Sequence, residues 1–330
     1  QELLKIGQFI PGCQGHDVKD LLQSATIETS SELVLSELYD DGPWFRLIYG
    51  AAQLLPVKKG PIPAISVDAK ATEASTLTVS IRKSLKDYNY TPDIILGTQD
   101  YKLEQGKNVI EIDNNLNLEE DTYLFICFHK EPNLELRMSN LRISGIVSVF
   151  NKQNIPVSNY GRQDPDPSLG FEAFEFWVPI RRPDGHNISM KIKPGLRAFS
   201  VQNLRNGINR PYISTNAWVA ALEDDQPTLK ISWNNKQVIK KLIFSFDTDW
   251  DQAMESSLLG HAESVMAFVV RSYLIYAGDT LVFEKVDNYQ TRNICRFKEP
   301  IETNEIKNNY KKSLPNVPVG LFGLSIYEED

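Results

Sequence analysis

The chain has few cysteines and histidines for its length: 330 residues contain three Cys and four His. Cys13, Cys127 and Cys295 lie far apart, without the paired spacing of a zinc site, and an odd number does not fit a disulfide framework. The histidines are scattered, with no His-x-x-x-His pair. The sequence therefore indicates neither a zinc centre nor a disulfide scaffold.

Basic residues and long apolar runs are also scarce. Lys and Arg number 35 against 43 Asp and Glu, which gives a net charge of −8. The small basic cluster of Lys307, Lys311 and Lys312 follows Glu302 and Glu305 and is typical of a solvated surface. Nucleic-acid binding requires clustered cations, and a membrane helix requires about 20 apolar residues. We therefore expect no nucleic-acid partner and no membrane span.

Several signatures of catalysis and targeting are missing. No G-x-G-x-x-G fingerprint occurs, no βαβ pattern could hold one, and no serine lies in a nucleophile elbow. No signal peptide is visible at Gln1, so we expect a mature chain, a piece of a larger protein or a cytosolic protein. Asn89 and Asn187 begin N-x-Ser/Thr sequons that are common by chance. Between compartments, we favour the periplasm or secretion.

The residues that are present predict an all-β protein. Hydrophobic residues make up 42% and charged residues 24%, as in a soluble globular domain. Short alternating runs are separated by turn-rich pieces, at residues 64–68, 76–82, 94–96, 108–112, 122–128 and 141–150. Short strands without intervening helices indicate antiparallel β-sandwiches. Within residues 122–128, Cys127 is expected to be a buried core thiol.

The pattern predicts two β-sandwiches in tandem, preceded by a short helix. Asp17 is a suitable N-cap, and Val18, Leu21 and Leu22 follow at helical spacing. Prolines and polar residues at 154–170 indicate a linker. The predicted ranges are a lead-in at 1–24, a first sandwich at 25–153, a linker at 154–170 and a second sandwich at 171–330.

A stretch at residues 203–249 characterises the second half. It contains an Asn206-Gly207 turn, then Trp218, then apolar runs at 229–233 and 238–246, which we predict to pair as an antiparallel hairpin. This order resembles coagulation-factor type C (discoidin-like) sandwiches, and it implies a galactose-binding-like jelly roll. The resemblance implies a structural calcium near Asn203 and Asn206. Asn206 replaces the family's Asp, so a tight turn without metal is the alternative.

A second resemblance covers most of the chain. Its segments are residues 4–11, 174–177, 205–207, 211–219, 245–249, 254–255 and 289–293. They resemble the region that follows the flavin domain in bacterial FAD-dependent oxidoreductases. This implies a non-catalytic accessory region whose partner is its own flavin domain, with FAD bound only by a parent protein.

Carboxylates gather after the run at 238–246. Alternation would place Asp247, Asp249 and Asp251 on one face, where they could bind a hard cation such as calcium. Glu255 and His261 lie nearby in the sequence. The alternatives are a solvated loop and a glycosidase that uses two of these carboxylates as acid and nucleophile.

Aromatic residues suggest a sugar-binding surface. Trp218 and Trp233 are expected in the core, whereas Trp250, between two aspartates, is expected to be exposed. The predicted ligand-binding residues are Trp250, Asp249, His261, Tyr289 and Arg292. The leading hypothesis is thus an accessory region of a flavin enzyme that also binds glycan. The alternatives are a free-standing carbohydrate-binding module and a glycoside hydrolase.

Overall fold

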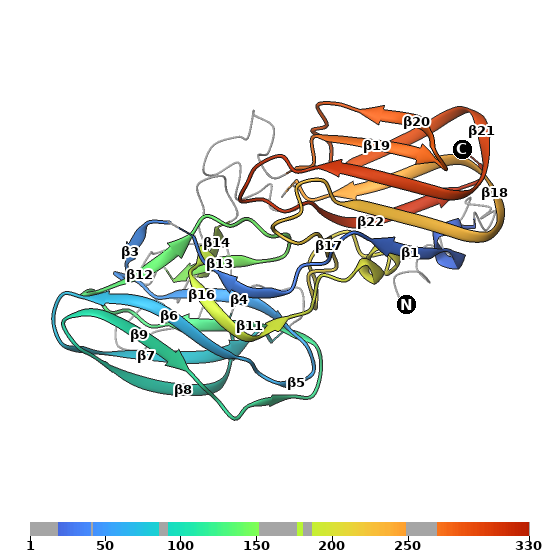
Figure 1. Ribbon diagram of the computed structural model, residues 1–330. Helices are drawn as coiled ribbons and strands as arrows, with labels where there is room; N and C mark the ends of the chain where they lie inside the picture. The colour runs from blue at the N-terminus through green and yellow to red at the C-terminus, as the bar shows by residue number, and fades with distance from the viewer. Residues whose placement is uncertain are drawn as a thin grey trace, which may run out of the picture.

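The computed structural model describes residues 19–40, 42–85, 92–151, 177–180, 187–248 and 269–329. These residues form antiparallel sheets arranged in two sandwiches, which confirms the all-β prediction (Figure 1). The helical turns among them are two 3-10 segments, η2 (Leu21–Ser24) and η4 (Val201–Arg205). No helix in this part of the chain has the length and apolar character needed to cross a bilayer.

The predicted N-terminal helix is not supported. Asp20, not Asp17, caps the short turn η2, and its carboxylate accepts hydrogen bonds from the amides of Leu22 (3.0 Å) and Ile326 (2.9 Å). Leu21 and Leu22 are fully buried in the core of the second sandwich. Strand β1 begins at Thr26, two residues after η2, so the chain becomes extended before another turn can form. Residues 1–18 lie outside the described part of the chain.

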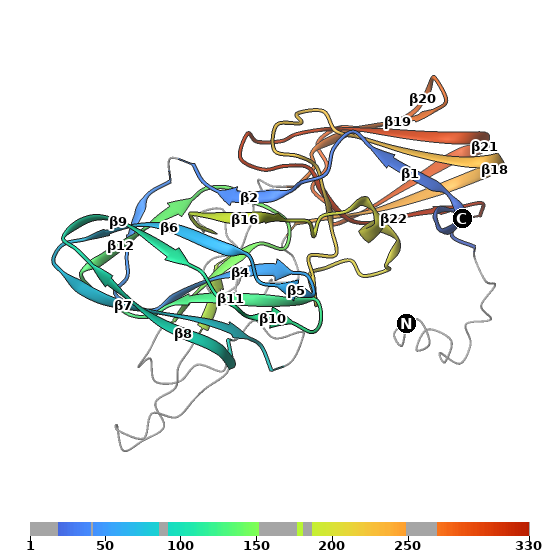
Figure 2. The same ribbon diagram turned by 60° about the horizontal axis from the view of Figure 1, so that its bottom comes forward.

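The first sandwich encloses its core between two sheets (Figure 2). One sheet has the order β14 (Trp177–Ile180), β13 (Val147–Asn151), β4 (Ala51–Val57), β11 (Thr122–Phe128), β7 (Ser75–Lys83), β8 (Ile94–Leu103). The other has the order β15 (Asn187–Ile188), β12 (Leu134–Ser139), β6 (Ala64–Ala71), β16 (Met190–Leu196), β2 (Leu35–Leu38), with β3 (Trp44–Arg46) on β12 and β9 (Gly106–Ile112) on β6. A two-residue pair, β5 (Gly60–Pro61) and β10 (Asn117–Leu118), stands apart.

Period-two alternation explains which side chains of this sandwich are inside. In β6, Ile65 and Val67 are buried while Ser66 between them is partly exposed. Strands β4 and β11 are buried on both faces, as expected of central strands that are covered twice. Cys127 of β11 is a fully buried thiol, as the sequence predicts.

The second sandwich is built on two long strands, β18 (Thr228–Phe246) and β21 (Arg292–Lys311). Its order is β17 (Trp218–Val219), β22 (Gly320–Tyr327), β18, β21, β19 (Ser272–Ala277), β20 (Thr280–Lys285), with β1 (Thr26–Thr29) on β18. The first half of β18 pairs with β1 and the second half with β22, and Figure 2 shows β19 and β22 diverging from the β18–β21 pair. Buried residues of both halves, such as Ile231 and Phe244, belong to one core.

The predicted hairpin at 229–246 is wrong. Both runs belong to the single strand β18, and each pairs with β21 instead of with the other. Asn234, Asn235 and Lys236 are exposed, but the backbone there shifts register between Ser232 and Gln237 without reversing direction. An irregularity in strand pairing, with a shift of register, therefore occurs where the polar triplet suggested a turn.

Strand pairing also crosses the predicted domain ranges. β1 lies within 25–153 but pairs with β18, where Ile27 packs opposite Ile231. β14, β15 and β16 lie beyond residue 170 but pair with β13, β12 and β6 of the first sandwich. Met190 and Ile192 of β16 are buried in the core of the first sandwich, which accounts for the position of β16 there. The predicted linker at 154–170 lies outside the described residues.

Hydrogen bonds join the two sandwiches directly. The Leu33 amide donates to the Val219 carbonyl at 2.8 Å, and the Arg142 amide donates to the Asn316 carbonyl at 2.9 Å. The Asn316 side chain returns a bond to the Asn140 carbonyl at 2.7 Å. Val219 and Ala217 also belong to the first core, so apolar packing continues across the junction.

A fully buried glutamine offers a test of the first sandwich. The Gln53 amide donates to the Val147 carbonyl (3.0 Å) and Asn187 Oδ1 (3.1 Å), and its oxygen accepts from the Ile188 amide (2.8 Å). We expect Gln53→Leu to lower the free energy of unfolding by about 2–4 kcal/mol, because it leaves these buried groups unpaired. Chemical denaturation should show almost no change for the exposed control Gln99→Leu. Equal effects of the two variants would contradict this account.

Candidate functional site

The residues that the sequence predicts as a site fall partly within the described structure. Asp247 follows β18, and pairing places Ser245 opposite Arg292. The Phe246 amide donates to the Thr291 carbonyl at 2.7 Å, so the residues next to Asp247 and Arg292 are hydrogen-bonded at one end of the sheet. Tyr289, in the preceding turn, is 61% exposed. The other predicted members lie outside the described residues: Asp249, Trp250, Asp251, Glu255 and His261.

The turn at Asn206 is formed by hydrogen bonds within the chain. Asn206 Oδ1 accepts from the Ile208 amide at 2.8 Å, and its Nδ2 donates to Asn216 Oδ1 at 2.9 Å. Asn203 Nδ2 donates to two backbone carbonyls. Gly207 has φ 75°, a conformation that favours glycine. The described residues contain no group of three His, Cys, Asp or Glu suited to a metal, and the calcium site stays a prediction.

Trp218 and Trp233 are core residues, as the sequence predicts. They are 0% and 7% exposed, and their indole N–H groups donate to the carbonyls of Ser31 (3.2 Å) and Leu21 (2.9 Å). Neither ring is available to stack on a sugar.

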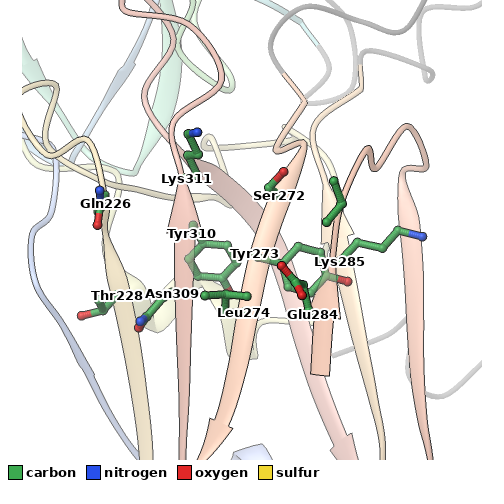
Figure 3. A pocket seen from close by; sticks show the side chains of 11 residues that line it. Gln226, Thr228, Ser272, Tyr273, Leu274, Glu284, Lys285, Asn309, Tyr310 and Lys311 are labelled. Carbon is green, nitrogen blue, oxygen red and sulfur yellow. The ribbon is translucent and has the colours of Figure 1, made fainter. Parts of the chain in front are cut away.

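A groove lies on the outer face of the second sandwich. Register places Thr228 of β18 opposite Asn309 of β21, Asn309 opposite Leu274 of β19, and Leu274 opposite Glu284 of β20. Directly opposed residues of antiparallel strands share a face, so these four side chains form one row across four strands (Figure 3). The pair Ser272 and Lys311 begins a second row next to it. Sequence reasoning missed this row because it depends on register.

The side chains of both rows point away from the core. The residues that alternate with them along β19 and β21 point into it. Tyr273 and Tyr310 are each 2% exposed and occupy the core beneath the groove. Burial raises the pKa of both phenols well above the usual value, and Tyr273 donates to Asn293 Oδ1 at 3.1 Å. Burial likewise raises the pKa of the neighbouring Cys295 thiol to about 11. These groups are neutral near pH 7 and serve as structure.

The groove has the size and the polarity of a small-molecule site. Its volume is about 460 Å³, and its lining also includes Gln226, Lys285 and Val286, with Tyr273 and Tyr310 at its base. Pockets of roughly 300–1,000 Å³ are typical of such sites. Among the described residues, Glu284 and Lys311 form no ion pair, and the buried Oδ1 of Asn309 accepts no hydrogen bond. Glu284, Lys311 and the Asn309 oxygen can therefore form hydrogen bonds with a ligand that they do not form with the described residues.

A second polar cluster lies in the first sandwich, and sequence reasoning also missed it. His129 Nε2 lies 2.9 Å from Ser80 Oγ and 3.2 Å from Arg82 Nη2, while Arg82 Nε donates to Ser80 Oγ at 2.8 Å. An arginine can only donate, so Nε2 must carry no proton and accepts both bonds. Ser80 is 0% exposed, which excludes it as a nucleophile toward a substrate in solvent. The cluster is a structural network.

Comparison with known proteins gives limited similarity. No protein-family model matches the chain, and no curated protein sequence matches it significantly. The resemblance to the region beside a flavin domain therefore stays a prediction.

Solved structures similar to this chain include carbohydrate-binding modules. The family 32 module of Streptococcus pneumoniae EndoD is 11% identical, with 41% of this chain and 88% of that chain covered and a TM-score of 0.32. The family 32 module of C. perfringens NanJ, solved with galactose, is 16% identical, with coverages of 40% and 88% and a TM-score of 0.30. Chitosan-binding module 1 of a Paenibacillus sp. IK-5 chitosanase/glucanase is 13% identical, with coverages of 40% and 87% and a TM-score of 0.29. At these scores the matches assign neither a ligand nor a site to this chain.

The His129 cluster predicts a specific pH dependence of stability. Burial and then the positive charge of Arg82 lower the pKa of His129, while Asp100 opposes them. Above the usual value of 6.5, His129 is neutral in both folded and unfolded chains. Below that pH the unfolded chain takes up a proton that the folded chain resists, so stability falls as the pH falls.

Thermal unfolding of wild type and His129→Gln between about pH 8 and pH 5 measures this effect. The glutamine keeps an acceptor near the Nε2 position but does not titrate in this range. We expect the wild type to lose stability relative to the variant below pH 6.5. Parallel curves for the two proteins would exclude this role of His129.

Proposed function

We propose that the second sandwich binds carbohydrate in the groove formed by β18, β21, β19 and β20. The observation that carries this proposal is the in-register row of Thr228, Asn309, Leu274 and Glu284. It places a hydroxyl, an amide and a carboxylate on one outer face, around one apolar side chain. The Asn309 amide oxygen at the centre of the row accepts no hydrogen bond from any residue that the structure describes.

This combination of groups matches the chemistry of a sugar. A pyranose presents hydroxyl groups that both donate and accept hydrogen bonds, together with apolar C–H faces. Thr228 and Asn309 can donate and accept, Glu284 can accept, and Lys311 can donate. Leu274 is half-buried and Val286 is 60% exposed, so both can contact C–H groups. The groove therefore supplies both kinds of contact within a single small volume.

Binding explains the groove better than hydrolysis does. Glycoside hydrolysis by the common mechanisms uses two carboxylates that flank the scissile bond. Among the described residues that line the groove, Glu284 is the single carboxylate. We therefore propose a carbohydrate-binding module and not a glycoside hydrolase.

Two conservative variants test the proposal. Thr228→Val removes a hydroxyl at nearly constant shape, and Asn309→Leu removes an amide whose buried oxygen is unpaired. Each lost hydrogen bond should cost about 0.5–1.5 kcal/mol of binding free energy, or roughly two- to tenfold in Kd. The thermal midpoint of Asn309→Leu should stay unchanged or rise, since a buried unsatisfied polar atom is removed.

The measurement uses the full chain on a glycan array that includes galactosides, fucosides, chito-oligosaccharides and uronic-acid oligomers. Isothermal titration calorimetry with the glycans selected by the array then gives Kd. Thr98→Val, which alters an exposed threonine of β8 in the first sandwich, is the matched control for Thr228→Val. Absence of binding to every glycan, or equal binding by wild type and both groove variants, would refute the proposal.

A further inference from the structure

The turn that follows β20 is held by an ion pair and lies at one end of the groove. Lys285 is the last residue of β20 and pairs with Tyr273, so the next residue, Val286, continues the groove beside Ser272. Asp287 has φ 55° and its carboxylate binds the Arg271 guanidinium at 2.9 Å. The backbone therefore leaves the sheet directly beside Val286 and Ser272, which both line the groove.

A buried asparagine fixes the rest of this turn. Asn288 is 0% exposed, its amide N–H donates to the Arg271 carbonyl at 2.8 Å, and its Nδ2 donates to the Val270 carbonyl at 2.9 Å. Its Oδ1 accepts from the Gln290 amide at 3.0 Å and from Asn293 Nδ2 at 2.7 Å. These bonds use the side-chain nitrogen and oxygen of Asn288. They fix the backbone on both sides of Tyr289.

Tyr289 is exposed in spite of this rigid setting. Its side chain is 61% exposed, whereas the neighbouring Asn288 is fully buried. Three residues span at most about 10–11 Å, so Tyr289 Cα lies within that distance of Val286 Cα at the end of the groove. This distance is within the span of about two sugar units. A rigid turn can present an aromatic ring with little loss of conformational entropy on binding.

We propose that Tyr289 is an aromatic platform for a second sugar unit, so that the site takes oligosaccharides of at least two units in preference to monosaccharides. This inference rests on the proposed carbohydrate-binding function of the groove. The groove would hold one unit through Thr228 and Asn309, and the ring of Tyr289 would stack on the C–H face of the next. Tyr289 thereby determines the length of the preferred ligand.

Calorimetry with a ladder of one to four sugar units of the glycan selected by the array tests this inference on the full chain. Tyr289→Ala should weaken binding of the tetrasaccharide by about fivefold or more, because a stacking contact is lost. Binding of the monosaccharide should stay within about twofold of wild type, since its contacts lie in the groove. Tyr289→Phe keeps the ring and should bind like wild type. Tyr39→Ala, which alters an exposed tyrosine of the first sandwich, is the matched control.

The outcomes separate the two proposals. Equal weakening of monosaccharide and tetrasaccharide by Tyr289→Ala would place Tyr289 in the first subsite and overturn the preference for length. No effect of Tyr289→Ala, together with weaker binding by Thr228→Val and Asn309→Leu, would overturn the role of Tyr289 and leave the groove supported. Absence of any glycan binding would overturn both. Unchanged thermal midpoints of the variants would show that each effect reflects binding.

Discussion

The antiparallel pairing of β18 with β21 is the constraint on which the second sandwich depends. The two strands contain 19 and 20 residues and pair over most of their length, with register shifts between Ser232 and Gln237 and between Ile239 and Lys241. The shifts change the neighbours of β18 from β1 to β22 without breaking its pairing with β21. One pair of strands thus contributes to both halves of the sandwich. The same register aligns Thr228 with Asn309, so the groove depends on it too.

The two sandwiches share their chain in a way that couples them. The chain enters through η2 and β1 in the second sandwich, builds the first, and returns through η4 to the second. Ala217 and Val219 then pack into the first core, while the adjacent Trp218 packs into the second. Successive side chains of β17 therefore point to opposite sides, so that this strand contributes one residue to each core. We expect the relative position of the sandwiches to be well defined, since apolar packing and backbone hydrogen bonds both cross the junction.

Three polar residues with buried side-chain atoms, Gln53, Asn288 and Asn309, differ in how those atoms are hydrogen-bonded. In the first sandwich, the polar atoms of Gln53 are satisfied by neighbouring strands, and the network adds stability. In the second, Asn288 fixes a turn that exposes Tyr289, whereas the enclosed Oδ1 of Asn309 accepts no hydrogen bond from the described part of the chain. An unsatisfied buried acceptor costs stability unless a ligand or water completes it.

The sequence by itself determined the fold class and the direction of many side chains. Alternation with period two places Leu229 and Ile231 inside and the residues between them outside, and this depends on local geometry alone. The burial of Cys127 could be predicted from the apolar run around it, and that of Trp218 from the resemblance to discoidin-like sandwiches. Tyr289 and Arg292 could be selected by residue type alone, and neither lines the groove.

Only the tertiary structure decided which strands are partners. The two halves of the predicted hairpin form one irregular strand that pairs with β21. β1 and β16 pair with strands of the sandwich other than the one expected for each. The tertiary structure also brought Ser80 to His129, 49 residues away, and aligned the four strands of the groove. Period-two alternation specifies the face of a strand but not its neighbour or its register. Those depend on long-range closure of the sheets and on burial of the whole core.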